Sequence, residues 1–257
     1  MTTATFQNGV YFVWKRNWNL FQKSWLINML WIVFEPTILL LTLGFGVGSF
    51  ISNIQGLTYM DFVFPSMLCT TAMFVSFFES TYNNFAKLSI QKTYTTLMLA
   101  PLEPFQIALA EILWGTTKGT ISAAGVAMVA VFFGLAHSFN ILLLLLIAAL
   151  IAFLFSSFGL IITTMVKNFD QIIYPSSGIV IPLSLLSSTY FPLDSIPGYF
   201  KYVAYLSPLT HAVELSRGLI YGTINWSYGV FHLAVLLVFS FIVFKIAIIR
   251  FNKKIQA

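Results

Sequence analysis

Four ionisable side chains lie inside long apolar stretches of this sequence: Glu35, Glu79, Glu111 and Lys118. A charged group in hydrocarbon costs several kcal/mol unless it is paired or hydrated, so each is a candidate functional residue. Glu35 and Lys118 each lie near the middle of their stretch. We favour a structural role, either a buried ion pair between them or a lysine that extends to the interface, over a contact with transported cargo. Glu79 and Glu111 lie near the ends of their stretches, where a structural role or a contact with a partner costs little.

Motifs for nucleotide, metal or covalent chemistry are missing from the sequence. There is no G-x-x-x-x-G-K-[ST], so the chain lacks the usual loop for ATP phosphates. Gly44, Gly46 and Gly48 lie inside an apolar stretch with no strand before them, which favours helix packing over a nucleotide site. The three histidines have no metal-ligand spacing, and no serine or cysteine has an activating context. We therefore expect no catalytic, metal or cofactor site in this chain.

Composition indicates a membrane solvent. Of 257 residues, 58% are hydrophobic and 8% are charged, and the mean hydropathy is +0.88. Soluble domains contain about 25% charged residues. The net charge of +5 comes from basic residues scattered around apolar stretches, so it does not indicate nucleic-acid binding.

Six stretches are long enough to cross a membrane, which takes roughly 20 apolar residues. Residues 6–25 precede them and carry Val10, Trp14, Trp18, Phe21 and Trp25 on one helical face, which predicts an amphipathic helix in the interface. The six are Trp25–Phe50, Met60–Tyr82, Ile107–Phe133, Ile141–Val166, Ile172–Thr189, which two prolines interrupt, and Tyr228–Arg250.

Lysine and arginine positions predict the orientation. With the N-terminus in the cytoplasm, ten basic residues fall on the cytoplasmic side and two, Lys201 and Arg217, on the outer side. Both termini are then cytoplasmic. The predicted fold is an all-α integral membrane protein of six transmembrane helices, forming one domain over residues 1–257. An interfacial helix precedes the spans, and a re-entrant or short helical segment, residues 190–227, precedes the last one.

This orientation places residues 83–106 in the cytoplasm. Ile90, Tyr94, Leu97 and Met98 share one helical face there, while Lys92 lies away from it. A short amphipathic helix of this kind packs its apolar face on the spans and offers its polar face to a partner protein.

The outer segment contains residues that typically mark turns and helix ends. Two prolines frame the turn from Phe191 to Pro197, and Ser207-Pro208 is a typical helix start. A run to Gly222 then carries its leucines on one side, with Arg217 pointing away from that side. Such a helix is tolerated at membrane depth only where protein or water surrounds it.

Several motifs resemble the permease subunits of ABC-2 type exporters, and more closely the NodJ-like group associated with lipo-oligosaccharide export. The resemblance covers essentially the whole chain. The motifs are Phe78-Glu79-Ser80-Thr81-Tyr82, Gln91-Lys92-Thr93-Tyr94, Met98-Leu99, Glu111 to Lys118, Tyr190-Phe191-Pro192-Leu193, Ile196-Pro197, and Pro208-Leu209-Thr210-His211 with the later Arg217.

This resemblance implies a homodimeric permease docked on a separate ABC ATPase subunit, which would carry the ATP and Mg²⁺. It implies that the interfacial helix and the segment Lys87–Thr96 face the ATPase, the latter as the main coupling helix, and that residues 167–171 make a second, minor contact with the ATPase. The outer segment would close the outer end of the transport path. The implied coupling residues are Lys87, Gln91, Lys92, Tyr94, Lys167 and Asp170; the implied outer-gate residues are Phe191, Pro192, Pro197, Pro208 and Arg217.

The sequence therefore favours a permease of the bacterial inner membrane that exports an amphipathic glycolipid or oligosaccharide. An exporter of small hydrophobic drugs or peptides is an alternative of the same class. An alternative from another class is a self-sufficient secondary transporter or channel driven by the intramembrane charges. It predicts paired broken helices and internal repeats, whereas we find only one interrupted span and no internal repeat. A membrane-embedded enzyme requires a polar catalytic cluster that the sequence does not offer.

Overall fold

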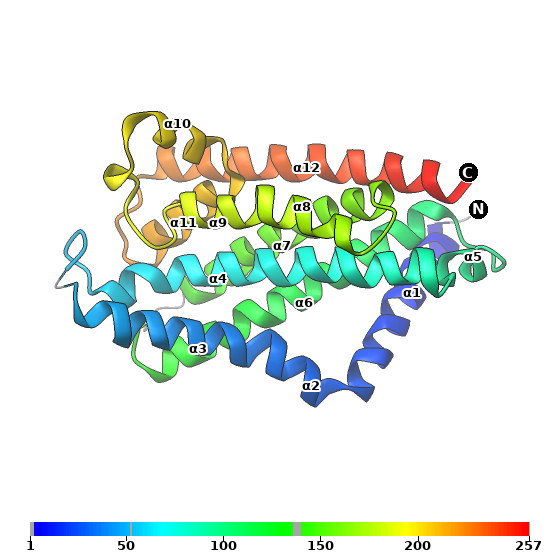
Figure 1. Cartoon of the computed structure of the whole chain (residues 1–257), viewed down its shortest axis with the longest axis horizontal. Coiled ribbons are helices and arrows are strands. Elements are labelled where there is room, and N and C mark those ends of the chain that lie inside the picture. Colours follow the sequence, from blue (N-terminus) through cyan, green and yellow to red (C-terminus); the bar gives the residue numbers. More distant parts are fainter. Residues whose placement is uncertain (1–2, 52, 136–139, 257) are drawn as a thin grey trace.

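The computed structural model describes residues 3–51, 53–135 and 140–256, and the extended elements in these ranges are helices. The helices lie along one long axis (Figure 1). Both chain ends and the short helix α5 (Thr93–Leu97) lie at one end of the bundle, here called the α5 end. Helices α10 (Gly198–Leu206) and α11 (Pro208–Ile220) lie at the other, the α11 end.

Three long helices form the centre of the bundle: α4 (Tyr59–Phe78), α6 (Pro104–Phe132) and α7 (Asn140–Met165). Small residues let their backbones approach closely. A Cβ at Gly119 of α6 would lie 2.7 Å from the Ala72 carbonyl of α4, and one at Gly159 of α7 would lie 2.9 Å from the Phe77 carbonyl. At these two positions the backbones are in direct contact, and elsewhere buried side chains of α4, α6 and α7 pack together as the core of the bundle.

Four helical stretches among the described residues are long and apolar enough to be candidate membrane spans. They correspond to the first, second, fourth and sixth spans expected from the sequence. The expected third span is α6, which is long but carries Glu111 and Lys118; the expected fifth is broken into short pieces. The candidates are Trp25–Ser49, Tyr59–Ile90, Asn140–Met165 and Trp226–Gln256, the last being α12.

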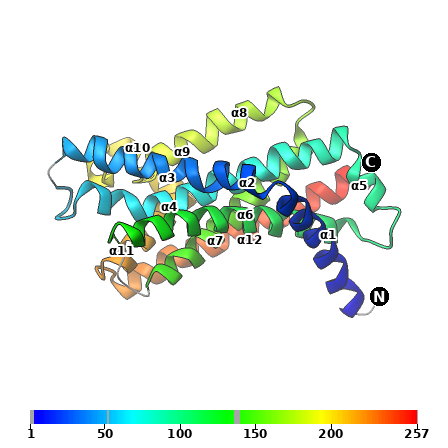
Figure 2. The ribbon, with the colours of Figure 1, turned by 90° about the horizontal axis from the view of Figure 1, so that it is seen from below.

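The first candidate span is little covered by the rest of the chain. It runs through α2 (Trp25–Met29), the π-helical turn η1 (Leu30–Phe34), α3 (Glu35–Leu41), η2 (Thr42–Gly46) and η3 (Val47–Ser49). The broken segment is η6 (Asp170–Ile172), α8 (Ile173–Pro175), η7 (Ser176–Val180) and α9 (Ile181–Leu186). It lies at the edge of the bundle (Figure 2).

Helix α1 (Thr3–Lys23) meets the α2–α3 run at a sharp angle (Figures 1 and 2). Ser24, with φ −124° and ψ 27°, is the break between them. Trp14, Trp18 and Phe21 pack against Trp114 of α6, with ring centroids 5.7–6.4 Å apart. We expected this face of α1 to meet lipid headgroups, but its central aromatic rings instead attach α1 to α6.

At the α5 end, helix α4 continues beyond the predicted span as two π-helical turns, η4 (Glu79–Asn83) and η5 (Ala86–Ile90). Lys92 then adopts φ 53°, which ends this helix and starts α5. Tyr94 of α5 is buried and packs on Phe251 of α12 with centroids 5.3 Å apart. Ile90 is exposed, so only part of the predicted apolar face of this segment is buried.

Candidate functional site

Two stripes of charged side chains face each other at the α5 end. They are Glu79, Asn83 and Lys87 on η4–η5, and Glu111, Trp114 and Lys118 on α6. The residues of the first set are four apart, and those of the second are three and four apart, so each set lies on one helical face. The acid comes first in each stripe and the base last. Because the two helices are antiparallel, each acid meets the base of the other stripe.

The first ion pair joins η5 to α6 and also holds α1. Lys87 Nζ lies 2.6 Å from Glu111 Oε2, and both side chains are at most 10% exposed. Asn17 of α1 donates to the same carboxylate oxygen at 2.9 Å and accepts from Lys87 Nζ at 3.2 Å. The Nη2 of Arg16 donates to Asn17 Oδ1 at 3.3 Å. A buried carboxylate and ammonium are therefore paired, with a carboxamide completing the contact.

The second ion pair joins η4 to α6 one to two helical turns away. Lys118 Nζ lies 2.8 Å from Glu79 Oε2. Asn83 donates to the same oxygen at 2.6 Å, and the Trp114 indole donates to Glu79 Oε1 at 2.7 Å. Lys118 Nζ also lies 5.6 Å from the centroid of the Phe21 ring of α1. Both carboxylate oxygens of Glu79 thus have donors.

The expected pair between Glu35 and Lys118 is not formed. Lys118 pairs with Glu79, whereas Glu35 is exposed and takes part in none of the ion pairs found among the described residues. Sequence depth alone suggested the wrong partner. The signal that identifies the right one is the reversed order of acid and base in two antiparallel helix faces.

Tyr94 lies beside the first ion pair. Burial raises the pKa of its hydroxyl well above the usual value, and the Glu111 carboxylate raises it further. The Tyr94 hydroxyl and Glu111 Oε1 are both buried without a hydrogen-bond partner. A neutral tyrosine against a carboxylate makes α5 sensitive to any shift of α6, since both groups lie in the packed interior.

A polar pocket of about 200 Å³ opens beside these ion pairs. A second pocket of about 580 Å³ adjoins it, and the two share Asn28, Glu79, Asn83 and Lys118. Together they form one cleft, here called the polar cleft, between α1–α2, α4–η4 and α6. Besides the shared residues, the first part is lined by Arg16, Asn17, Leu20, Phe21, Ser24, Lys87, Gln91 and Trp114, and the second by Trp31, Ile32, Glu35, Val75, Phe78 and Tyr82.

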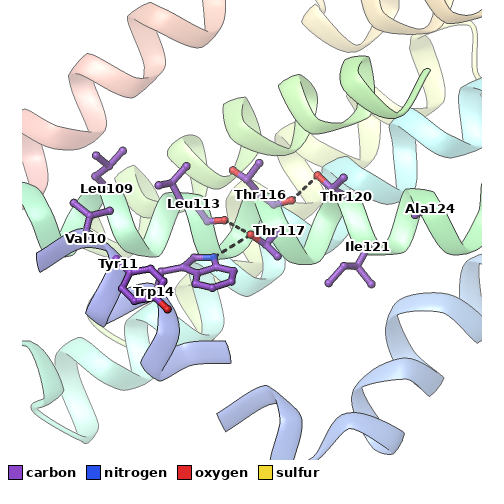
Figure 3. A pocket seen from close by; sticks show the side chains of 10 residues that line it. All are labelled: Val10, Tyr11, Trp14, Leu109, Leu113, Thr116, Thr117, Thr120, Ile121 and Ala124. Atoms are coloured by element: carbon purple, nitrogen blue, oxygen red, sulfur yellow. Dashed lines mark hydrogen bonds between the residues drawn. The ribbon is translucent and has the colours of Figure 1, made fainter. Parts of the chain in front are cut away.

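A larger groove, of about 720 Å³, lies on the other flank of α1 against α6 (Figure 3). The Trp14 indole points into it and donates to Thr117 Oγ1 at 3.1 Å. The hydroxyls of Thr116, Thr117 and Thr120 donate to carbonyls of their own helix, so the wall presents mainly carbon. Among the described residues that line this groove none is charged, so it offers less polar recognition than the cleft.

The proposed coupling residues do not all lie on the surface. Gln91 and Lys92 are exposed, as are Lys167 and Asp170, whereas Lys87 and Tyr94 are buried. Phe169 brings residues 167–171 to the same end by packing on Phe85, with ring centroids 4.9 Å apart. Lys87 therefore acts inside the protein, through its pair with Glu111, and is not available to a partner.

A groove of about 530 Å³ lies beside α5, and the sequence did not predict it. Lys92, Thr95 and Met98 line one side, and Lys254 and Ile255 from the end of α12 contribute the other. The C-terminal lysines carried no pattern that tied them to α5. Only the packing of α12 on Tyr94 brings them there.

At the α11 end, Arg217 is buried, although the sequence placed it on a face pointing away from the packed side. Its Nη2 donates to Ser188 O at 2.8 Å, to Phe62 O at 3.2 Å and to Ser66 Oγ at 3.2 Å. Its Cζ lies 3.8 Å from the centroid of the Phe62 ring. This set of contacts, here called the Arg217 latch, ties α11 to α4.

The latch lies where Pro65 interrupts the hydrogen bonding of α4. Pro65 has no N–H, so the Asp61 carbonyl lacks its helical donor. The Tyr221 hydroxyl supplies one at 2.8 Å. Of the other predicted gate residues, Pro208 is buried at the start of α11, Phe191 and Pro197 are exposed, and Pro192 is half-buried.

Metal ligation has no support in the described part of the chain, which contains no group of three or more His, Cys, Asp or Glu side chains placed for an ion. His211 and His232 form a buried pair with Nδ1 atoms 2.7 Å apart. His211 Nε2 donates to the Tyr205 carbonyl at 2.9 Å, because a carbonyl can only accept. Between two neutral rings, His211 Nδ1 then accepts the hydrogen bond that His232 Nδ1 donates.

Comparisons with known proteins agree with the membrane character of the chain. Residues 8–221 match the ABC-2 type transporter family. Nodulation protein J of Rhizobium leguminosarum bv. trifolii is 31% identical over 210 residues, which cover 82% of this chain and 80% of that protein. Nodulation protein J of Rhizobium leguminosarum bv. viciae is 30% identical over 80% of this chain and 79% of its own length. The inner membrane transport permease YadH of Escherichia coli K12 is 23% identical over 79% and 78% of the two chains.

The Lys87–Glu111 pair predicts a strongly coupled double-mutant cycle. Glu111→Gln leaves the Lys87 ammonium buried without a counter-ion, and Lys87→Met strands the Glu111 carboxylate. Each single change should lower stability by about 3–5 kcal/mol. The double variant Lys87→Met/Glu111→Gln should recover most of the loss, because the carboxamide introduced by Glu111→Gln still accepts from Asn17. Thermal unfolding of the purified protein in detergent measures this.

The matched control is the exposed pair of Lys201 and Asp194 at the α11 end, whose Nζ–Oδ1 distance is also 2.6 Å. Asp194→Asn should leave the unfolding temperature unchanged, since water screens this pair. Equal losses at both pairs, or additive losses at Lys87 and Glu111, would contradict the view that burial gives the internal pair its importance.

Proposed function

Since the chain belongs to the ABC-2 type transporter family and is a multi-pass inner-membrane protein, we propose that it exports an amphipathic glycolipid or oligosaccharide-type cargo. The energy comes from ATP hydrolysis on a separate subunit, because ABC-2 permeases are transport components and work with an ABC ATPase. The observation that carries the choice of cargo is the polar cleft, whose first part presents mainly carboxamides and charged groups and whose second part adds the apolar surface of Trp31, Phe78 and Tyr82.

An amphipathic cargo matches both parts of this cleft. Carboxamides and charged groups in the first part are suited to hydroxyls and other polar groups of a headgroup. Trp31, Phe78 and Tyr82 in the second part offer flat apolar surface to a chain or to a sugar face. A small hydrophobic drug would use the second part only, and a self-sufficient ion-driven transporter needs free charges. The charges of η4–η5 and α6 at this end are instead paired, whereas Arg16 and the exposed Glu35 take part in none of the ion pairs found among the described residues.

Coupling to the ATPase takes place at the α5 end in this proposal. The groove lined by Lys92, Thr95, Met98, Lys254 and Ile255 receives an element of the ATPase that carries acidic and apolar side chains. Gln91 and the exposed residues Lys167 and Asp170 flank it. Lys87 and Tyr94 transmit the movement from inside, because they connect α5 and η5 to Glu111 of α6.

The membrane topology is part of the same proposal. The α5 end and both termini lie in the cytoplasm, and α6 and the segment of α8–α9 cross the membrane besides the four candidate spans, giving six. The exposed apolar faces of α2–α3 and α8–α9 meet lipid or a second copy of the chain, so that two copies enclose the path.

The outer segment closes the path at the α11 end. The short helices α10 and α11, with the turn from Phe191 to Pro197, cover the end of the bundle. The Arg217 latch holds α11 on α4 at the Pro65 break, where hydrogen-bond acceptors are exposed to it. Opening this end breaks those bonds.

Docking at the α5 groove predicts a charge-reversal effect. In Lys92→Glu/Lys254→Glu, two acidic groups replace the basic rim, so the affinity for the native ATPase should fall at least about tenfold, equivalent to 1.4 kcal/mol. Affinity purification of the tagged chain from its native membrane, with quantification of the ATPase subunit and of ATP hydrolysis, measures this. Export of a labelled glycolipid and of a hydrophobic dye by the same membranes identifies the class of cargo.

Lys201→Glu, at the opposite end, should retain the ATPase and serves as the matched control. A stable chain that brings down no nucleotide-binding subunit would overturn the permease proposal. Export of the dye without the glycolipid would overturn the class of cargo alone.

The topology predicts a labelling pattern for single cysteines. The one native cysteine, Cys69, is buried, so Cys69→Ala gives a silent background. A cysteine placed at Gln91 should react with a membrane-impermeant maleimide only after the cells are permeabilised, and one placed at Asp194 should react in intact spheroplasts. The reverse pattern would invert the orientation, and equal reactivity at both sites would rule out a spanning arrangement.

The Arg217 latch predicts that Cys69 becomes reactive when the latch is weakened. Cys69 Sγ lies 3.4 Å from Ser216 Oγ, beside Arg217 in α11. Arg217→Gln removes the donors to Phe62 and Ser188, so the labelling rate of Cys69 should rise at least about tenfold. Glu214→Gln changes the half-exposed partner of Arg217 on the same helix and should leave the rate unchanged. Equal rates in wild type and Arg217→Gln would show that other contacts hold α11.

A further inference from the structure

The first part of the polar cleft carries an excess of positive charge. Arg16, Lys87 and Lys118 line it, and Glu79 is the one carboxylate among its lining residues. Glu111 lies just behind and pairs with Lys87. Three cations against two carboxylates leave this part, of about 200 Å³, with one positive charge that has no carboxylate partner; the remaining carboxylate of the cleft, Glu35, is exposed and lines the second part.

The uncompensated charge is on Arg16. Lys87 and Lys118 each contact a carboxylate within 2.8 Å, whereas Arg16 has no carboxylate within ion-pair distance among the described residues. Its Nη2 makes a 3.3 Å bond to Asn17, and its Nε is buried without a hydrogen-bond partner. A guanidinium presents its donors as a planar fork that fits two oxygens of one phosphate. The orphaned Nε is one prong of that fork.

Neutral donors complete the surroundings of Arg16. The carboxamides of Asn28, Asn83 and Gln91 line the same pocket. Asn28 uses one N–H on the Ser24 carbonyl at 2.9 Å and has a second one free to donate. These groups add hydrogen bonds to an anion without adding charge.

The second part of the cleft provides for an apolar chain. Trp31 and Tyr82 are both exposed on its walls, and the Phe78 ring lies beside the Tyr82 ring with centroids 6.0 Å apart. The α2–α3 run forms one wall and is little covered by the rest of the chain, so an apolar tail along this wall adjoins the lipid. A ligand that fills both parts has an anionic head and a long apolar tail.

We propose that the polar cleft binds a lipid of the cytoplasmic leaflet by its phosphate group, with Arg16 as the main phosphate ligand and the tail along Trp31, Phe78 and Tyr82. This proposal rests on the proposed function, which places the α5 end at the cytoplasmic side of the membrane. The phosphate belongs either to an anionic phospholipid of the bilayer or to a lipid-linked cargo, and the chemistry that recognises it is the same.

The experiment uses the full-length protein in phosphatidylcholine nanodiscs or in detergent, and native mass spectrometry to count bound lipid. Three probes are added in turn: dioleoyl phosphatidylglycerol, a polyprenyl monophosphate, and a neutral alkyl glycoside with a tail of similar length. Wild type should bind one or both phosphate lipids in preference to the glycoside.

Arg16→Gln should weaken phosphate-lipid binding about tenfold. Arg16→Lys should give an intermediate result, because a point charge remains but the fork is lost. The matched control is Lys15→Gln, which removes the neighbouring charge on α1; Lys15 lies over the Tyr11 ring at 5.5 Å, outside the cleft. Lys15→Gln should bind as wild type does.

The outcomes separate the sources and the proposals. Dependence on Arg16 for phosphatidylglycerol alone supports a resident bilayer lipid, and dependence for the polyprenyl phosphate alone supports lipid-linked cargo. Binding that is equal in wild type and Arg16→Gln, or that follows Lys15 as strongly, overturns the site. ATPase retention and export are measured on the same variants. A wild-type protein that retains no ATPase subunit would contradict the exporter proposal, whereas the lipid site is judged by the lipid-binding data alone.

Discussion

Charge that is buried must be paired, and this constraint organises the α5 end of the molecule. Glu79–Lys118 and Lys87–Glu111 join the extension of α4 to α6 in reversed order along two antiparallel helices. Shifting either helix by one turn would separate both pairs at once, so the pairs fix register as well as contact. The packing of α1 and α5 depends on that register, because Asn17 of α1 and Tyr94 of α5 both adjoin the Glu111 carboxylate. The polar cleft between these elements depends on it as well.

The two ends of the bundle are held by different means around the same core. At the α11 end, a proline breaks α4, and Tyr221 and Arg217 donate to carbonyls beside the break. Between the ends, glycines bring α4, α6 and α7 into backbone contact. The close contacts of α4, α6 and α7 therefore lie between the ion pairs at one end and the Arg217 latch at the other.

Much of the fold followed from sequence, and the site followed only in part. Apolar stretches and basic residues predict helices and an orientation, but they do not choose partners, so Glu35 was matched with Lys118 by depth alone. The pair with Glu79 required knowing which face of η4 meets α6, and the pair of Lys87 with Glu111 required knowing that η5 continues the helix past Tyr82. Arg217 was placed on an outward face because helical periodicity separates polar from apolar residues, whereas this guanidinium satisfies carbonyls inside. Long-range contacts of this kind leave no local pattern.

Of the elements around the polar cleft, α1 is the one whose displacement would break the weaker contacts. Separating α6 from the extension of α4 breaks two buried ion pairs, each leaving a charge without a partner. Moving α1 breaks no ion pair: it breaks the hydrogen bonds of Asn17 with Glu111 and Lys87, that of Trp14 with Thr117, and the ring packing on Trp114. Ser24 already interrupts the helix between α1 and α2, so α1 is not held by a continuous helix on that side. Arg16 sits on this movable element, so an anion bound in the cleft would draw α1 onto the charge it lacks.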